Sequence, residues 1–409
     1  MFVVIKLLFF VLSIFINSAV TVSVRNSPTR YPVILVPGDG GSQIEARLNK
    51  PSVVHIWCQQ KTDNWFPLWL NLELLAPYVV DCFADNMKLV YDPVTRTTNN
   101  NPGVETRVLG FGNTSTVEWL DESHFIHTDY FHDIITNLVS TLGYIRGVSI
   151  RGAPYDFRKA PNEMGDFIDK LRKLIEDTYR VNNNTKVVLL GHSMGCPFLL
   201  YMLNRQPQSW KDKFVKSLVT LAGPWGGAVK ALRLMASGDN LGVFLVNPLS
   251  VRIEQRSMPS SAWLIPYDTF WNTSEVLVYG PTYNYTIKDY GRFFKDINFT
   301  DGILMRQDTE QLTKKLEPPG VEVHCLYGGG IKTPAQLQYS QKQWYDSQPD
   351  VVFGDGDGTV NERSLLGCQR WIGKQMQSVH HQLFSGAEHM GILHDNRITD
   401  YIREYVLSS

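Results

Sequence analysis

The sequence lacks a surplus of charge, and that absence excludes several classes of protein. Its 39 Lys and Arg residues face 40 Asp and Glu residues, which gives a formal net charge of −1. Binding to nucleic-acid phosphates needs a basic surface, so a nucleic-acid-binding protein is not expected. Charged residues make up 19% of the chain and hydrophobic residues 43%. This balance excludes a disordered or collagen-like chain and supplies a large core.

Cysteine is also scarce. Five cysteines in 409 residues are too few for a disulfide scaffold, and the odd number leaves at least one thiol unpaired within a monomer. Internal repeats are absent as well. Aromatic residues, by contrast, make up 12% of the chain and include 10 Trp, which indicates large apolar surfaces that are either covered or contacted. The length exceeds a minimal domain, since domains hold roughly 100–200 residues.

The first 19 residues, Met1–Ala19, are typical of a secretory signal peptide. Lys6 precedes the apolar run Leu7–Ile16, which at about ten residues is shorter than the roughly 20 that a spanning helix needs. An uncleaved anchor is the alternative. Five glycosylation sequons agree with the secretory route; they start at Asn113, Asn183, Asn272, Asn284 and Asn298. No Lys-Asp-Glu-Leu-type retention signal is present, so we expect a lysosomal or secreted protein.

Short apolar runs alternate with helical patterns along the rest of the chain. The expected strands are Pro32–Val36, Val148–Ile150, Lys186–Leu190, Phe214–Leu221, Val321–Leu326 and Val379–Phe384. The expected helices include Glu163–Tyr179 and Ile392–Val406. This alternation predicts an α/β fold with a mostly parallel sheet covered by helices on both faces. Two stretches, Val53–Asp92 and Gly226–Gly320, depart from the rhythm and are expected to be insertions.

A candidate nucleophile lies in the middle of the chain. Gly191–Gly195 reads Gly-His-Ser-Met-Gly and matches Gly-x-Ser-x-Gly, a pattern that is weak by itself. The apolar strand run Val187–Leu190 precedes it and the apolar helical run Phe198–Leu203 follows it. Strand, sharp turn and helix together form a nucleophile elbow, in which the glycines let the turn close and Ser193 stands at the end of the sheet. A plain Ser-Gly turn is the alternative.

A loop after the first strand offers oxyanion donors. A tetrahedral intermediate needs backbone N–H groups aimed at its negative oxygen. We expect one from Met194, which follows the nucleophile, and one from Asp39 in the glycine-rich loop Pro37–Ser42. The Asp39 carboxylate would then lie beside the reacting centre and make activity sensitive to acid pH. A plain tight turn or a dinucleotide-binding loop are the alternatives, and the glycine spacing does not fit the second.

The base and the acid should follow the serine in the order acid, then histidine. The histidines after Ser193 are His324, His380, His381, His389 and His394. His389 is the expected base, because it follows a strand and the Gly386 turn, whereas the others fall within expected strands or a helix. For the acid, a strand ending at Phe353 leads into a loop that offers either Asp355 or Asp357. The same loop resembles the start of a calcium loop, but Leu366 stands where that loop needs glutamate.

Several motifs together resemble the lecithin–cholesterol acyltransferase family, and within it most closely the lysosomal phospholipase branch. The matching stretches are Pro37–Gly40, Arg151–Asp156, Gly191–Gly195, Ala222–Gly227, Ala236–Asn240, Arg306–Glu310, Asp355–Asn361 and Glu388–His389. They span nearly the whole chain after the signal. The resemblance implies an α/β-hydrolase fold and a triad of Ser193, Asp357 and His389, which chooses between the two acids. Gly40 departs from the leucine expected there, and Ser42 from asparagine, so substrate fit near this loop is expected to differ.

These patterns and the resemblance together give the expected division of the chain. We expect a signal peptide at 1–19, hydrolase core at 20–52, a membrane-binding subdomain at 53–92, core with the nucleophile elbow at 93–225, a cap or lid domain at 226–320, and core with the acid and base at 321–409. The flexible stretch Ala236–Gly242 is the expected lid. The implied disulfides are Cys58–Cys82 and Cys325–Cys368, which leaves Cys196 as a free, buried thiol.

Large apolar side chains cluster inside the first insertion. Their i, i+4 spacings predict a short amphipathic helix, and this composition suits an enzyme that docks on lipid. The expected membrane-binding residues are Trp65, Phe66, Trp69, Leu70 and Leu72. Packing against the core is the alternative, and the resemblance favours the membrane.

The expected activity is that of a serine-dependent phospholipase A and lipid transacylase. The resemblance implies that an acyl-serine forms from a glycerophospholipid and passes its acyl group to water or to a lipid alcohol, ceramide-like or a sterol. No metal or organic cofactor and no nucleic acid is required, and a monomer is expected. The alternatives are a sterol acyltransferase of the plasma type, a neutral lipase or carboxylesterase, and an inactive lipid-binding protein.

Overall fold

The computed structural model describes residues 30–121, 124, 128–240, 242, 246–340 and 344–407. Its centre is a six-stranded sheet in the order β15-β12-β9-β8-β1-β7, in which every neighbouring pair is parallel. The strands are β1 (Val33–Val36), β7 (Ile150–Gly152), β8 (Val187–His192), β9 (Val215–Leu221), β12 (Glu322–Gly329) and β15 (Val379–Ser385). All six expected strands are confirmed, although β7 begins where its prediction ended. The expected signal peptide lies outside the described residues.

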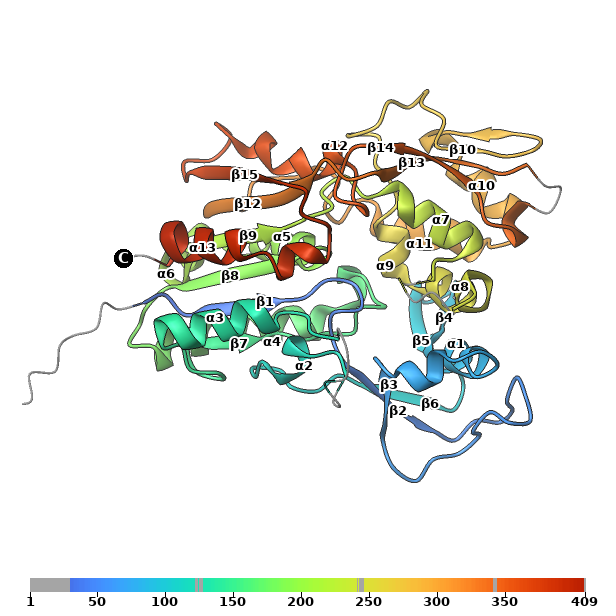
Figure 1. Ribbon diagram of the computed structural model, residues 1–409, viewed down its shortest axis with the longest axis horizontal. Helices are drawn as coiled ribbons and strands as arrows, with labels where there is room; N and C mark the ends of the chain where they lie inside the picture. Colours follow the sequence, from blue (N-terminus) through green and yellow to red (C-terminus); the bar gives the residue numbers. More distant parts are fainter. Residues whose placement is uncertain are drawn as a thin grey trace, which may run out of the picture.

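Helices cover both faces of this sheet (Figure 1). Alternate residues of a strand point to opposite faces, so Val33 and Leu35 of β1 pack with α3 (His132–Leu142) and α13 (Asn396–Tyr401). Ile34 and Val36 pack on the other side with α4 (Gly165–Val181) and α5 (Gly195–Leu203). Because both faces of β1 and β8 are buried, these strands read in the sequence as continuous apolar runs.

The last expected helix is interrupted. Ile392–Val406 is divided into the 3₁₀ turn η6 (Gly391–Leu393), α13 and the π-helical turn η7 (Ile402–Val406). Asp395 causes the break, since its side chain accepts a hydrogen bond from Arg397 N and starts a new helix as an N-cap.

The first insertion does not contain the predicted helix over its Trp and Leu cluster. Instead β3 (Phe66–Trp69) is an edge strand of the antiparallel sheet β3-β2-β6, with β2 (Ile44–Leu48) and β6 (Val104–Arg107). Pro67 explains the error, because proline disfavours a helix interior and is tolerated at a sheet edge. The remaining elements here are η1 (Leu72–Leu75), α1 (Val80–Met87), β4 (Leu89–Asp92) and β5 (Thr97–Asn100).

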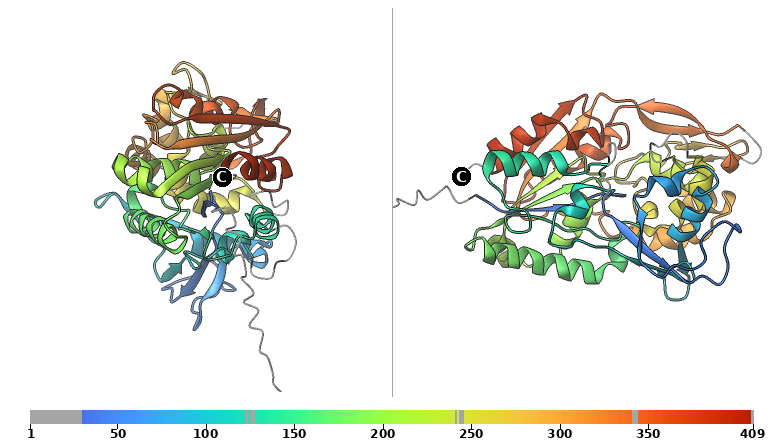
Figure 2. Two further views of the ribbon diagram at one scale, coloured as in Figure 1. Left: turned by 90° about the vertical axis from the view of Figure 1, so that its left-hand side faces the viewer. Right: turned by 60° about the horizontal axis from the view of Figure 1, so that its bottom comes forward.

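A helical region lies over the carboxyl ends of the central strands, next to the first insertion (Figures 1 and 2). It contains α7 (Val229–Ser237), α8 (Pro248–Ser257), α9 (Pro259–Trp263), α10 (Tyr290–Asp296) and α11 (Asp301–Thr309). A second sheet, β11-β10-β13-β14, joins β10 (Val278–Tyr279) and β11 (Asn284–Tyr285) to β13 (Thr333–Gln338) and β14 (Asp350–Gly354). The strand expected before the acidic loop is therefore β14, which belongs to this outer sheet. None of the described helices is both long and apolar enough to span a bilayer.

Candidate active site

Ser193 occupies a strained turn between β8 and α5. Its backbone φ is +51°, a left-handed conformation that non-glycine residues rarely adopt. The turn is closely packed, because a Cβ atom on Gly195 would lie 2.3 Å from Val36 O. Ser193 N donates to Leu221 O over 2.8 Å, which ties the turn to β9. The half-buried side chain is therefore presented at the end of the sheet, as a nucleophile elbow requires.

The structure brings Ser193, His389 and Asp357 together. His389 Nε2 lies 2.9 Å from Ser193 Oγ, and His389 Nδ1 lies 2.7 Å from Asp357 Oδ2. Burial of Asp357 opposes its ionisation, but the adjacent His389 and the N–H groups of Val360 and Thr359 outweigh burial and lower its pKa. The buried carboxylate can then orient the imidazole and stabilise its protonated form, while the imidazole can take the serine proton.

The other acid and the other histidines lie elsewhere. Asp355 accepts hydrogen bonds from Gly330 N and Gly356 N over 2.7 and 2.6 Å, so it stabilises the loop. His324 and His380 stack on each other in β12 and β15, and His394 pairs with Asp133. Of the acids and histidines that the sequence offered, His389 contacts Ser193 directly and Asp357 is connected to it through His389. Among the described residues, the other candidate acid and histidines have no such hydrogen-bonding connection to Ser193.

The glycine-rich loop after β1 packs directly against the serine. A Cβ atom on Gly38 would lie 2.6 Å from Ser193 Cβ, so only glycine allows this approach. The carboxyl of Asp39, the next residue, faces the cavity, where protein atoms surround it and displace bulk water. This desolvation raises the pKa of Asp39 to about 6, against the opposing effects of Gly40 N–H and the charge of Lys230. The loop thus places a carboxyl of unusual pKa beside the serine.

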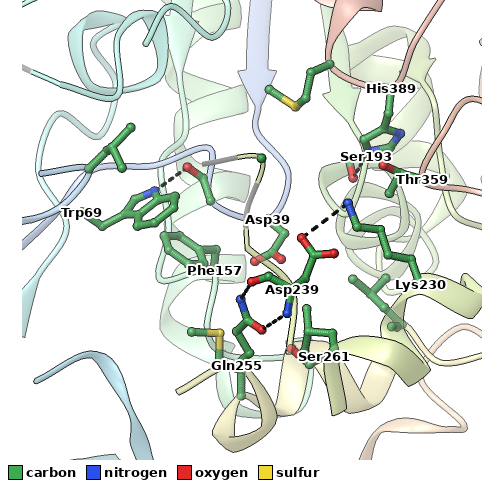
Figure 3. A pocket seen from close by; sticks show the side chains of 18 of the residues that line it. Asp39, Trp69, Phe157, Ser193, Lys230, Asp239, Gln255, Ser261, Thr359 and His389 are labelled. Carbon is green, nitrogen blue, oxygen red and sulfur yellow. Dashed lines mark hydrogen bonds and ion pairs between the residues drawn. The ribbon is translucent and has the colours of Figure 1, made fainter. Parts of the chain in front are cut away.

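A cavity of about 620 Å³ opens in front of Ser193 and His389. Figure 3 shows Asp39, Trp69, Phe157 and Lys230 around it. Its walls are largely apolar and come from β3, α1, α7, α8 and α9; they include Trp69, Leu70, Leu72, Phe83, Met87, Ala231, Leu234, Met258 and Leu264. A volume of this size and character suits an acyl chain or another apolar group.

The stretch expected to form a lid begins at the end of α7. Gln255 of α8 holds Asp239 through its main chain, accepting from Asp239 N over 2.9 Å and donating to Asp239 O over 2.8 Å. The Asp239 carboxylate also lies 3.7 Å from Lys230 Nζ. Leu241 lies outside the described residues. The described part of the expected lid is thus fixed to α8 at the rim of the cavity.

The expected membrane residues do not share one helical face. Trp69, Leu70 and Leu72 line the cavity, and Trp69 Nε1 donates to Gly40 O over 2.7 Å. Trp65 lies against the guanidinium groups of Arg47 and Arg107, and Phe66 is half-buried. The sequence did not reveal this contribution to the cavity, because the strand brings Trp69 to a loop 29 residues earlier.

The cysteines form the pairs that the resemblance implies. Disulfides join Cys58 to Cys82 and Cys325 to Cys368. Cys196 is free and buried. Burial raises the pKa of its thiol, which lies 3.2 Å from Gly191 O. Cys196 therefore behaves as a small packed side chain under the nucleophile turn.

These features define an α/β-hydrolase. The sheet is parallel and covered on both faces, the serine stands in a strained turn after a central strand, and the histidine follows the last strand. The chain belongs to the lecithin:cholesterol acyltransferase family, which it matches over residues 65–396. It is 49% identical to the rat lysosomal phospholipase A and acyltransferase over 376 residues, which cover 92% of this chain and 90% of the relative. The human protein of the same description is 48% identical over 376 residues, with the same shares covered. The chicken phosphatidylcholine-sterol acyltransferase is 43% identical over 365 residues, or 89% of this chain and 87% of the relative.

Proposed function

We propose that this member of the family is a phospholipase A and acyltransferase that uses Ser193 as its nucleophile. The observation that carries the proposal is the hydrogen-bonded line from Ser193 Oγ through His389 to Asp357, over 2.9 and 2.7 Å. Relatives described as lysosomal phospholipase A and acyltransferase support the choice of a phospholipid as acyl donor.

The reaction has two steps. His389 accepts the Ser193 proton as the oxygen attacks an ester carbonyl of the phospholipid, and Asp357 stabilises the imidazolium. The backbone N–H groups of Asp39 and Met194 donate to the oxyanion. His389 then protonates the leaving lysophospholipid, and an acyl-Ser193 ester remains. In the second step His389 accepts a proton from water or a lipid alcohol as its oxygen attacks the acyl carbonyl, and His389 then returns the proton to Ser193 Oγ as the acyl–serine bond breaks.

The apolar cavity favours a lipid alcohol over water in the second step. Its apolar surface includes Trp, Phe, Leu and Met side chains, which would place an acyl chain beside Ser193 and limit the local concentration of water. A ceramide-like acceptor is the proposal, because relatives with the lysosomal description are more similar to this chain than the sterol acyltransferase named above.

An exposed apolar patch lies on the first insertion, whose helix α1 also lines the cavity. It consists of Val54, Ile56, Trp57 and Tyr78, which we call the 54–78 patch. Ile56 is 96% exposed, Tyr78 81% and Trp57 58%, and Trp57 Nε1 donates to Tyr78 O. Exposing such a cluster to water is unfavourable, and burying it in a bilayer interface lowers the free energy. We propose that the 54–78 patch and the 40%-exposed Leu72 dock on the membrane, in place of the single helical face expected from the sequence.

The docking proposal can be tested by sedimentation with phosphatidylcholine vesicles. An Ile56→Ser/Trp57→Ser double variant should bind vesicles at least about fivefold more weakly. Ile145→Ser is the matched control, because Ile145 is 60% exposed but lies between α3 and β7 in the hydrolase core. Equal loss in both variants, or no loss in the double variant, contradicts the proposal.

The secretory and lysosomal address is also a proposal. The two disulfides agree with an oxidising compartment. The five sequon asparagines, at positions 113, 183, 272, 284 and 298, are all exposed, so each can carry a glycan. A mass shift on treatment with an endoglycosidase, removed by Asn→Gln changes at these positions, is the expected result.

Product analysis tests the reaction itself. Phosphatidylcholine vesicles should yield free fatty acid and lysophospholipid, and a ceramide analogue in the same vesicles should divert acyl groups into acylceramide. Ser193→Ala is the control. Transfer to a sterol instead would favour the plasma-type reaction, and faster release from triacylglycerol emulsions would favour a neutral lipase. Binding of lipid without formation of any product would indicate a lipid-binding protein instead of an enzyme.

A further inference from the structure

A buried tyrosine connects the glycine-rich loop to the nucleophile turn. Gly38 N donates to Tyr130 Oη over 2.9 Å, and Tyr130 Oη lies 2.5 Å from His192 Nδ1. Because the tyrosine oxygen accepts from Gly38, its own proton is available for His192. Tyr130 is buried in the main core and belongs to neither the triad nor the oxyanion donors.

The connection continues to the triad histidine. His192 Nε2 lies 2.9 Å from the main-chain oxygen of His389. His389 N in turn donates to the main-chain oxygen of Asp357 over 2.8 Å. The backbone of His389 is therefore held on both sides: His192 binds its carbonyl oxygen, and Asp357, which also orients the His389 ring, binds its N–H.

The direction of these bonds selects one form of His192. Nδ1 accepts from Tyr130, so Nε2 carries the proton and donates it to the His389 carbonyl. Only this neutral tautomer satisfies every atom, since a doubly protonated ring would place a donor against the tyrosine proton. Burial, with a further contribution from the charge of His389, lowers the pKa of His192 to about 3, against the opposing effect of Asp357. The neutral form thus persists at acid pH.

We propose that Tyr130 and His192 are positioning residues that hold the oxyanion loop, the nucleophile turn and His389 in register. The inference rests on the serine mechanism proposed above and assigns two further residues to it. Neither touches the reacting atoms. Tyr130 fixes Gly38, whose packing on Ser193 sets the position of the next N–H, and His192 fixes the backbone from which the base projects. Small errors in such alignments cost large factors in rate.

The test is the rate at which a fluorophosphonate probe labels Ser193, with steady-state hydrolysis of the soluble ester p-nitrophenyl butyrate beside it. Tyr130→Phe removes only the hydroxyl. It should slow labelling and lower kcat about 10- to 100-fold while KM changes less than about twofold, because the lost function is alignment. Tyr144→Phe is the matched control. Its hydroxyl is also buried and donates to Tyr31 O over 2.7 Å, but away from Ser193, so labelling and kcat should stay within twofold of wild type.

Substitutions of His192 separate alignment from folding. His192→Gln keeps an amide donor near the position of Nε2, whereas His192→Ala removes it, so the glutamine variant should label several-fold faster at equal melting temperature. A Tyr130→Phe/His192→Ala double variant should lose little more labelling rate than the worse single variant, since both residues act through one hydrogen-bond chain.

In Tyr130→Phe, His192 also loses the bond that favours its neutral form, so the acid limb of the kcat profile should move to higher pH. The groups that act electrostatically on it are His389, Asp357 and His394.

Labelling of Tyr130→Phe at the wild-type rate, or equal losses in Tyr130→Phe and Tyr144→Phe, would overturn the inference. Additive losses in the double variant would overturn it as well. Failure of the probe to label folded wild-type protein at Ser193 is a different outcome, because it would overturn the proposed function and the inference with it.

Discussion

The two walls of the cavity are built on different principles. On the sheet side, Ser193, His389 and Asp357 are joined by short hydrogen bonds, and Tyr130 and His192 continue the network into the core. On the side of α1, α7, α8 and α9 the lining combines apolar residues, among them Phe83, Met87 and Leu234, with a separate group of polar residues that includes Lys230, Gln255 and Ser261. Directional bonds fix atoms to within fractions of an ångström, whereas apolar contacts tolerate changes of shape. One wall therefore holds the proposed reacting groups in place, and we expect the other wall to select the acyl chain that fits.

The largest effect is expected on the sheet wall. Ser193→Ala removes the nucleophile and should lower phospholipid hydrolysis at least about 10⁴-fold, because the remaining triad residues cannot form an acyl-enzyme. Hydrolysis is measured as fatty acid released from phosphatidylcholine vesicles, with vesicle binding as the control for folding. Retention of a tenth of the activity would mean that another residue is the nucleophile.

A second large effect is expected for Asp357→Asn. The change keeps the shape of the side chain but favours the wrong tautomer of His389, so kcat should fall about 10³- to 10⁴-fold. The matched variant is Asp355→Asn, two residues earlier, where the carboxylate accepts from Gly330 N and Gly356 N. We expect less than about a tenfold loss there. Equal losses would show that the two loop acids are not distinct in function.

On the apolar wall a smaller, selective effect is expected. Leu234 of α7 is half-buried and lines the cavity. Leu234→Trp should lower activity on long-chain phospholipids about tenfold while hydrolysis of p-nitrophenyl butyrate changes little, because the added ring fills space that only a long chain needs. Ile303→Trp is the control, since Ile303 of α11 is half-buried against a different hydrophobic cluster. Parallel losses on both substrates would mean that this wall also supports the chemistry.

The smallest effect is a change of pH dependence at Asp39, where the two walls meet. With its pKa raised to about 6 by desolvation inside the cavity, the carboxyl is neutral below that pH and negative above it. A negative charge next to the developing oxyanion opposes the reaction, so wild-type activity should fall as the pH rises through about 6. Asp39→Asn should keep its activity at pH 5 and gain several-fold at pH 7. An unchanged profile of kcat against pH in Asp39→Asn would show that the Asp39 carboxyl does not influence the reaction.

The sequence predicted the sheet wall well. Strands buried on both faces, such as β1 and β8, read as short apolar runs bounded by turn residues. The glycines around Ser193 marked a turn, and the backbone φ of +51° at Ser193 confirms it. The acid was different. Asp355 and Asp357 share one turn, so spacing left both open, and only the family resemblance chose the one that the structure places beside His389.

The apolar wall was predicted less well, because its contacts join distant segments. The spacing of Trp65 to Leu75 imitated a helix, while Pro67 and pairing with β2 made a strand. Tyr130 and His192 are 62 residues apart, and neither carries a local signal that could have connected them. Side-chain type and period determine elements, but the partners of a buried hydroxyl are determined by tertiary packing.

Mass spectrometry of the acyl-enzyme tests the central claim most directly. Wild-type protein is mixed with phosphatidylcholine vesicles at acid pH, quenched within seconds and digested. We predict a fatty acyl group on the peptide that contains Ser193, which disappears on adding a ceramide analogue as acylceramide forms, and which is absent in Ser193→Ala. Product formation by Ser193→Ala at the wild-type rate, or an acyl group on a different residue, would contradict the account.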